Sequence, residues 1–354
     1  MPPKVLLYEI KADCGQICTK MINKNNLHKI HVVVADADRK MADVLVAVLR
    51  QLGLSKVTLV KNGRQALEII KTGTVDLLVT EWEMEPMSGV NLIKTLRFSD
   101  DPYFALLPII MLTARARRED VTAARDMGVT EFLVKPYTPG TLFSRLEHVI
   151  DFPRDLIIYE HYTGPDRRRI DRKPKQEQRE HDPETLPLPK KLEKAGKPAI
   201  RILSRSEIRK KAKITQALNK VITTKMLQEA QEAINEFTGE ALEWIKQDMN
   251  DLQDASKRII EEHNERLIPT IKTSLLSIRS RAGTFGFSVA SQVAFDLYNF
   301  IEDSFLMEND RHHVVVDKYT EGLKVILARQ ITNDMSDAEI QLIQGLEELK
   351  SALA

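Results

Sequence analysis

Short apolar runs alternate with amphipathic stretches between Lys29 and residue 150. Each run has the length and composition of a strand that is buried on both faces, and the stretches between them carry apolar residues at helical spacing. The expected strands are His31–Ala35, Val57–Val60, Val75–Thr80, Pro108–Leu112 and Phe132–Val134. The expected helices are Met41–Leu52, Arg64–Lys71, Ser88–Arg97, Arg118–Met127 and Thr138–Ile150. Because short right-handed crossovers join such units, the pattern predicts a doubly wound α/β domain with a five-stranded parallel sheet at residues 29–150.

The pattern changes twice after this domain. Residues 151–205 are rich in proline and charge, which favours a linker that is disordered or ordered only locally. Residues 206–354 are helical in pattern and predict a bundle, with a capping box, Ser336-x-x-Glu339, at the start of the last helix. The expected helices are 206–235, 238–265, 269–282, 288–305, 314–330 and 336–353. Residues 1–28 have no clear periodicity, and the sequence leaves open whether they belong to the natural chain.

Composition and charge exclude several classes of protein. The formal net charge is +1, which gives no reason to expect binding to nucleic acid or to a membrane surface. A membrane-spanning helix needs about 18 consecutive apolar residues, and no such run occurs. The N-terminus lacks the apolar core of a signal peptide, so we expect a cytoplasmic protein. Cys14 and Cys18 have a C-x3-C spacing that fits neither a redox motif nor a zinc pair, and we interpret them as ordinary thiols.

Four polar residues each follow a different expected strand: Asp36, Glu81, Thr113 and Lys135. In parallel α/β sheets the ligand site lies beyond the carboxyl ends of the strands, so these side chains should converge at one edge. Carboxylates suit a hard cation, a lysine neutralises a phosphoryl group, and a threonine hydroxyl hydrogen-bonds it. These residue types could therefore bind a cation and a phosphoryl group at this edge.

Segments around these residues resemble response-regulator receiver domains in order and spacing. They are Val32–Asp38 with its acidic residues, Val75–Gly89 around the phosphoacceptor, Pro108–Ala114 with its Thr-Ala pair, and Phe132–Tyr137 with its Lys-Pro turn. The resemblance covers residues 29–150 and implies a flavodoxin-like receiver in two-component signalling. It also implies that Phe132 is the aromatic switch and that histidine kinases or other two-component proteins are the partners.

The sequence departs from the family pattern at three places. Glu81 stands where the family has its phosphoacceptor aspartate, and Ala37 stands where it has the main metal-binding acid. The family usually has a Met-Pro pair after the acceptor; here Glu85 lies between Met84 and Pro86 and interrupts it. Asp38 lies one residue beyond the acidic pair and should point elsewhere. These changes put phosphorylation of the domain in doubt.

The replacement of the main metal-binding acid by Ala37 predicts weak metal binding. Mg²⁺ demands near-ideal geometry, so we expect no cofactor, or weak Mg²⁺ held by Asp36 and Glu83 if any binds. The extra methylene of Glu81 should move its carboxylate towards Lys135 and Thr113. Three interpretations remain open: Glu81 imitates the phosphorylated state, the site is inert and the domain is a docking scaffold, or a carboxylate is still phosphorylated.

The helical half carries a second resemblance. Leu276–Gly286 is similar to the motif of histidine phosphotransfer domains, with Ala282, Gly283, Phe285 and Gly286 at its end. The position of the phosphorylated histidine falls on Leu276, which cannot carry phosphate. The resemblance covers residues 240–335. The alternative is an unrelated bundle whose two glycines make a tight interhelical turn.

The remaining histidines and arginines give weaker evidence of a functional site. His263 resembles a solvated helix residue, and His312 and His313 are expected in a loop, without partners at metal-ligand spacing. The arginines of Gly164–Arg169 are expected to form a solvated linker patch, and no helix-turn-helix pattern follows.

Together the patterns predict a non-enzymatic two-component regulator that acts by protein–protein contact without phosphorylation. The alternative is a conventional phosphorylated response regulator with a helical output domain. The oligomeric state is left open.

Overall fold

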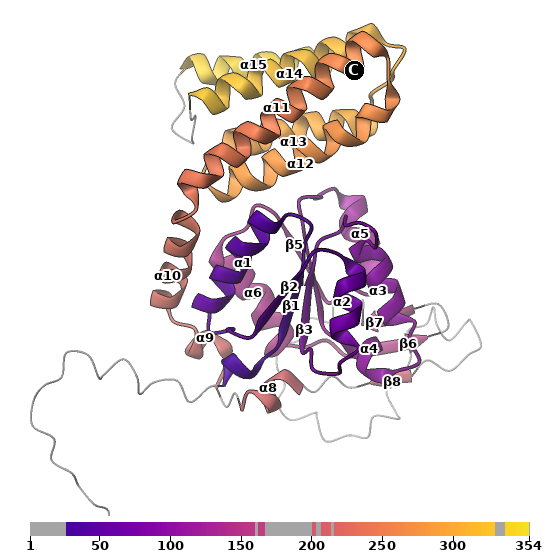
Figure 1. The fold of residues 1–354 in the computed structure, drawn as a ribbon, viewed down its shortest axis with the longest axis vertical. Coiled ribbons are helices and arrows are strands. Elements are labelled where there is room, and N and C mark those ends of the chain that lie inside the picture. Colours follow the sequence, from indigo (N-terminus) through magenta and orange to yellow (C-terminus); the bar gives the residue numbers. More distant parts are fainter. Residues whose placement is uncertain are drawn as a thin grey trace, which may run out of the picture.

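The computed structural model describes residues 26–159, 162–166, 200–202, 207–213, 216–329 and 337–353. The chain folds into an α/β domain and a helical bundle, and the bundle lies over the carboxyl ends of the strands (Figure 1). Within the described ranges, no helix is both long and apolar enough to cross a membrane.

The five-stranded parallel sheet confirms the predicted fold class. Its strands are β1 Val32–Ala35, β2 Val57–Val60, β3 Leu77–Thr80, β4 Ile109–Thr113 and β5 Glu131–Val134. They pair in the order β2-β1-β3-β4-β5, and all pairs are parallel. Every residue of β1, β3 and β4 is buried, as their continuous apolar runs predict. The register aligns Ala35 with Thr80, so the strands end side by side.

Helices cover both faces of the sheet. They are α1 Arg39–Gln51, α2 Gly63–Ile70, α3 Gly89–Arg97, α4 Pro102–Leu106, α5 Arg118–Asp126 and α6 Pro139–Ile150. Helices α1 and α6 share one apolar core, and α2, α3 and α5 share the other. Side-chain oxygens of Asp38, Asn62, Ser88 and Thr138 cap the helices that begin immediately after each strand-end loop. These caps fix where the chain leaves the sheet, and therefore where the strand-end residues lie.

A small antiparallel sheet lies in the segment expected to be a linker. It consists of β6 Leu156–Tyr159, β7 Tyr162–Pro165 and β8 Ile200–Ile202, in the order β7-β6-β8. The order in residues 151–205 is local: the apolar run of β6 pairs with β7 in a hairpin despite the surrounding charge. Pro165 is tolerated because it lies on an edge strand. The arginines of the expected patch after Asp166 lie outside the described residues.

The helical half begins with short pieces. The single helix expected over 206–235 is instead α8 Glu207–Lys211, α9 Leu218–Val221 and α10 Thr224–Asn235. Lys213 has a φ of 50°, a left-handed conformation that ends α8, and the Thr223 hydroxyl caps a separate α10. Helix α10 packs against α1 and α6 and so belongs to the covering of the receiver-like domain.

The bundle proper comprises α11 Thr238–Glu262, α12 Ile268–Thr284, α13 Ser288–Asp303, α14 Asp310–Ala328 and α15 Asp337–Leu353. The turn between α12 and α13 requires a glycine, because Gly286 has a φ of 91°. The loop expected for His312 and His313 is wrong: both lie in the first turns of α14 and are buried. Asn309 caps this helix, since its side-chain oxygen accepts the Arg311 N–H.

One buried cation joins the C-terminal ends of α3, α4 and α5. The Arg97 side chain at the end of α3 is 1% exposed, and its Nε donates to the Gly128 carbonyl at 2.8 Å. Its Nη1 donates to the carbonyls of Ala105 and Leu107 at 2.9 and 2.8 Å. Burial lowers the pKa of this guanidinium to about 10.

Replacing this cation should destabilise the fold. Arg97→Met leaves three buried carbonyls without their donor, so we expect the free energy of unfolding to fall by roughly 2–5 kcal/mol in urea denaturation. Arg125→Met, which removes an exposed ion pair with Asp126, is the matched control and should change it by less than about 1 kcal/mol. Equal effects of the two substitutions would contradict this account.

Candidate functional site

The ends of three strands bring three charged side chains together. Asp36 follows β1, Glu81 follows β3 and Lys135 follows β5. Backbone bonds extend the sheet into these positions: Glu81 N–H donates to the Ala35 carbonyl, and Lys135 N–H donates to the Thr113 carbonyl, both at 2.8 Å. The rigid sheet therefore sets the position of each side chain, as the sequence predicts for the carboxyl edge.

Lys135 bridges the two carboxylates. Its Nζ lies 2.7 Å from Asp36 Oδ2 and 2.8 Å from Glu81 Oε2. The exposed fractions of the side chains are 5% for Lys135, 6% for Asp36 and 15% for Glu81. Two backbone amides complete the set: Trp82 N–H donates to Glu81 Oε1 at 2.7 Å, and Asp38 N–H donates to Asp36 Oδ1 at 2.9 Å. Charge-assisted bonds of this length are strong, so both carboxylates are held in place.

The pocket carries one more negative than positive charge. Burial raises the pKa of Asp36 to about 6; Glu81 adds to the rise, and Lys135 opposes it. Burial disfavours the charged form of Lys135, but Asp36 and Glu81 outweigh it and raise the pKa of the lysine above its ordinary value. The ammonium is therefore the fixed charge of the site, whereas burial favours the protonated form of Asp36.

The other predicted pocket residues surround this group. The Thr113 side chain is buried at the end of β4, where its Oγ1 accepts the Arg115 N–H at 3.3 Å. Phe132 on β5 is half-buried and packs against the core of α2, α3 and α5. Tyr137 is buried beyond Pro136, and burial raises the pKa of its phenol above the ordinary value.

The other acidic residues near the pocket, Asp38 and Glu83, bind arginines. Asp38 points away from the pocket: its carboxylate caps α1 and binds Arg281. Glu83 is exposed and binds Arg115 at 2.5 Å, so it is not brought to Asp36. Among the described residues, no group of three or more His, Cys, Asp or Glu side chains is placed to hold a metal. Since Lys135 already occupies the space between the carboxylates, the donor set does not fit the cation that the fold implies.

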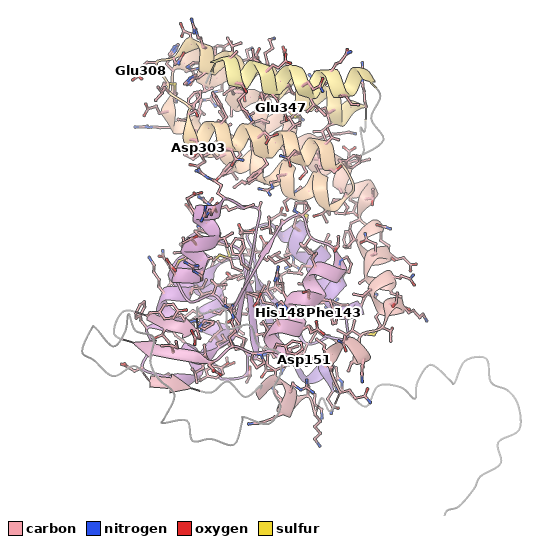
Figure 2. All side chains as sticks on the ribbon, turned by 180° about the vertical axis from the view of Figure 1, so that it is seen from behind. Phe143, His148, Asp151, Asp303, Glu308 and Glu347 are labelled. Carbon is pink, nitrogen blue, oxygen red and sulfur yellow. The ribbon has the colours of Figure 1, made fainter. Side chains whose placement is uncertain are left out.

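Residues of the bundle lie over the rim of the pocket, which sequence analysis missed. Arg279 Nη1 donates to the Ala114 carbonyl at 2.8 Å, and Arg281 Nη2 binds Asp38 Oδ2 at 2.9 Å. Asp303, on the side of the bundle that faces the α/β domain (Figure 2), pairs with Arg117. The phosphotransfer-like motif of Leu276–Gly286 includes Arg279, but a sequence motif does not reveal which residues this arginine contacts.

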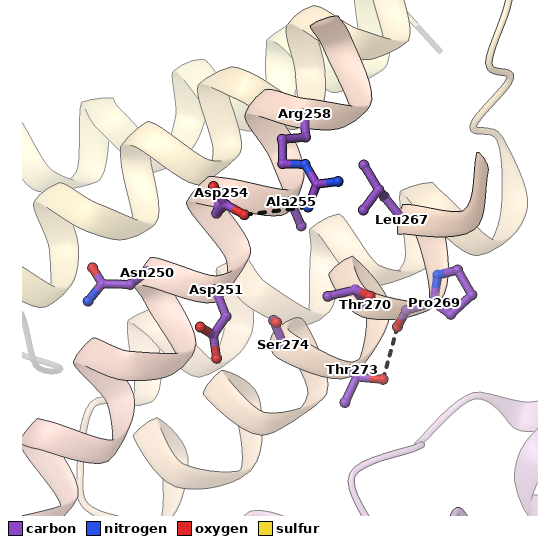
Figure 3. Close-up of a pocket in the computed structure, with 10 residues that line it drawn as sticks. All are labelled: Asn250, Asp251, Asp254, Ala255, Arg258, Leu267, Pro269, Thr270, Thr273 and Ser274. Carbon is purple, nitrogen blue, oxygen red and sulfur yellow. Dashed lines mark hydrogen bonds and ion pairs between the residues drawn. The ribbon is translucent and has the colours of Figure 1, made fainter. Parts of the chain in front are cut away.

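A cavity in the bundle lies outside this group. It has a volume of about 690 Å³ between α11 and α12, and Asn250, Asp251, Asp254 and Arg258 line one side (Figure 3). Its charged residues are already engaged, since Arg258 pairs with Asp254 at 3.8 Å and with Glu262 at 3.0 Å. The strand-end pocket remains the site with buried, convergent charges.

Comparison with known proteins agrees with the strand-end geometry. Residues 32–147 match the family described as response regulator receiver domain. Chemotaxis protein CheY-3 of Vibrio cholerae is 32% identical over 131 residues, which are 37% of this chain and 96% of that protein. Chemotaxis protein CheY of Pseudomonas aeruginosa is 31% identical over 120 residues, which are 34% of this chain and 95% of that protein.

The structure of a putative response regulator from Chloroflexus aurantiacus is 30% identical, with a TM-score of 0.32, over 34% of this chain and 98% of its own. The curated relatives are covered almost completely, although they match little more than a third of this chain. Through its N-terminal α/β domain, this chain belongs to the response regulator receiver family.

Proposed function

We propose that this protein is a non-enzymatic regulator of two-component signalling that acts by protein–protein contact, without phosphorylation of its receiver domain. The observation that carries the proposal is the bridge from Lys135 to Glu81 and Asp36, at 2.8 and 2.7 Å. Glu81 already holds the ammonium that a phosphoryl group on an aspartate would attract. Receiver domains act with histidine kinases and other two-component proteins, and we propose partners of this kind in the cytoplasm.

Glu81 is poorly placed to act as a nucleophile. Its Oε2 accepts from Lys135 and its Oε1 accepts from the Trp82 amide, so neither oxygen is uncommitted. Attack on a phosphoryl group needs in-line placement, and a displacement of about 1 Å can cost roughly a hundredfold in rate. Ala37 also removes a carboxylate that would share a Mg²⁺ ion. Both effects support a receiver state that is set by folding rather than by a phosphoryl donor.

The alternative is a conventional phosphorylated receiver with a helical output domain. Lys135 and Thr113 keep the positions at the ends of β5 and β4 that such a mechanism needs. The two proposals differ in one observable, the uptake of phosphate.

Acetyl phosphate distinguishes the two. After incubation with Mg²⁺ and acetyl phosphate, the natural chain should gain no mass in intact-protein mass spectrometry, because its acceptor and metal carboxylates are both altered. A variant with Ala37→Asp and Glu81→Asp restores both groups and should gain one phosphate. Uptake by the natural chain would sink the proposal and require the modified residue to be mapped.

The arrangement of Asp36 and Glu81 in the pocket depends on the buried Lys135 ammonium that bridges them. Lys135→Met leaves Asp36 and Glu81 facing each other without it, so the free energy of unfolding should fall by about 3–5 kcal/mol. Adding Asp36→Asn and Glu81→Gln removes the unpaired charges and should restore most of this loss. Lys71→Met, at an exposed pair with Glu68, is the control and should cost less than about 1 kcal/mol. An equally small loss for Lys135→Met would show that the bridge does not hold the pocket.

The raised pKa of Asp36 makes stability depend on pH. Between its ordinary value of 3.8 and about 6, the native state keeps a proton that the unfolded chain has released. The free energy of unfolding therefore falls as the pH rises through this window. Urea denaturation at pH 4 to 6.5 should show this fall in the difference between the natural chain and Asp36→Asn. A difference that rises with pH would mean that ion pairing with Lys135 outweighs burial.

A further inference from the structure

We propose that α12 is an intramolecular cap on the receiver pocket, and that a partner protein reaches the strand-end rim only by displacing it. The rim consists of the loops that follow β1, β4 and β5, and each of these loops contacts the bundle. Asp38 binds Arg281, the Ala114 carbonyl accepts from Arg279, and Pro136 packs against Gly283. The proposal concerns access to the rim and holds whether or not Glu81 accepts phosphate.

The approach at Gly283 is closer than a side chain would permit. A Cβ atom added to Gly283 would lie 2.8 Å from Pro136 Cβ and 2.7 Å from Ser291 Oγ. Glycine inside a helix costs about 1 kcal/mol relative to alanine, so this position is unfavourable for α12 alone. Its benefit is contact between the helix backbone and the residue that follows Lys135. Helix α12 thus lies directly on the loop that carries the cation of the pocket.

Two arginines fasten this contact. Arg281 is 9% exposed and lies between two carboxylates, Asp38 of the receiver domain at 2.9 Å and Asp248 of α11 at 2.6 Å. Arg279 is equally buried; its guanidinium lies 3.4 Å from the centroid of the Phe295 ring and reaches the Ala114 carbonyl. Burial raises the pKa of Asp248 to about 6, with Arg281 opposing. The Arg281–Asp38 pair and the hydrogen bond from Arg279 to Ala114 are the contacts of these arginines that cross from the bundle to the α/β domain.

Buried ion pairs of this kind favour specificity over strength. Their desolvation offsets most of their attraction, whereas the loss of one partner is costly because the other stays buried and unpaired. Two further contacts at the edge, Lys40 over the Trp244 ring and Arg117 with Asp303 and Glu302, are more exposed. The interface therefore fixes one docked arrangement and can be released as a unit rather than loosened gradually.

The chain provides a pivot for this release. Helix α10 packs on α1 and α6, and its Ala230 and Ile234 belong to the receiver core. Glu236 and Phe237 separate α10 from α11, so bending there would lift α11–α15 and leave α10 in place. Since the bundle stays tethered, its high effective concentration favours return to the rim. A partner must compete with the bundle for the rim, so it binds only when its affinity or concentration exceeds that of the tethered bundle.

Two substitutions on opposite sides of the interface test the cap. Gly283→Leu forces a side chain against Pro136, and Asp38→Asn removes the charge facing Arg281 while asparagine still caps α1. Gly345→Leu is the matched control, because a Cβ at this helical glycine of α15 meets nothing within 4 Å. Hydrogen exchange of the full-length chain is measured in the rim amides of residues 36–41 and 113–117, and small-angle scattering gives the maximum dimension.

In both interface variants, rim exchange should rise by about tenfold or more, exchange in β2 and α14 should stay unchanged, and the maximum dimension should increase. Gly345→Leu should leave all three unchanged. If Gly283→Leu unfolds the bundle, as rapid exchange in α14 would reveal, Asp38→Asn decides, since Asp38 lies outside the bundle. Rim exchange within about twofold of the natural chain in Asp38→Asn, or in a folded Gly283→Leu, would overturn the cap.

Discussion

An ammonium group removed from water must keep its anionic partners, and this constraint at Lys135 organises the receiver pocket. The side chain is 5% exposed, and the ends of β1 and β3 supply its two carboxylates. The parallel register places those strand ends side by side, so the backbone brings the partners to the cation. Glutamate at position 81 has the reach to close the bridge, since its Oε2 lies 2.8 Å from the lysine Nζ.

Much of the receiver could be predicted because its signals are local and repeated. Buried parallel strands are continuous apolar runs, and the residues after them converge for topological reasons that hold for any such sheet. The meeting of Glu81, Lys135 and Asp36 followed from these two facts. Glu83, the second residue of the predicted metal pair, lies in an exposed loop where Arg115 binds its carboxylate. Spacing along the chain does not encode such a contact.

The misses fall where tertiary contacts override local pattern. The hairpin of β6 and β7 is too short to stand out against its charged surroundings, yet it packs beside Gly128, a contact that no local sequence pattern reveals. The break of the expected helix 206–235 depends on a left-handed residue, Lys213, that helix propensity does not identify. Arg281 resembles any arginine of an amphipathic helix, and its two carboxylate partners lie 33 and 243 residues away in sequence. Only the assembled structure brings them together.

The packing of α10 on α1 also bears on how such a chain can evolve. Receiver domains are commonly regarded as modules that recombine with different neighbours, because each has its own closed core. Here the apolar core of the sheet continues through α1 into α10, which follows the α/β domain in sequence. A recombination point placed after α6 would leave the α1 surface that α10 now covers open to water, and would invite aggregation. A division that keeps the α1 surface covered therefore falls after α10, at Glu236 and Phe237, rather than at the end of the five-stranded domain.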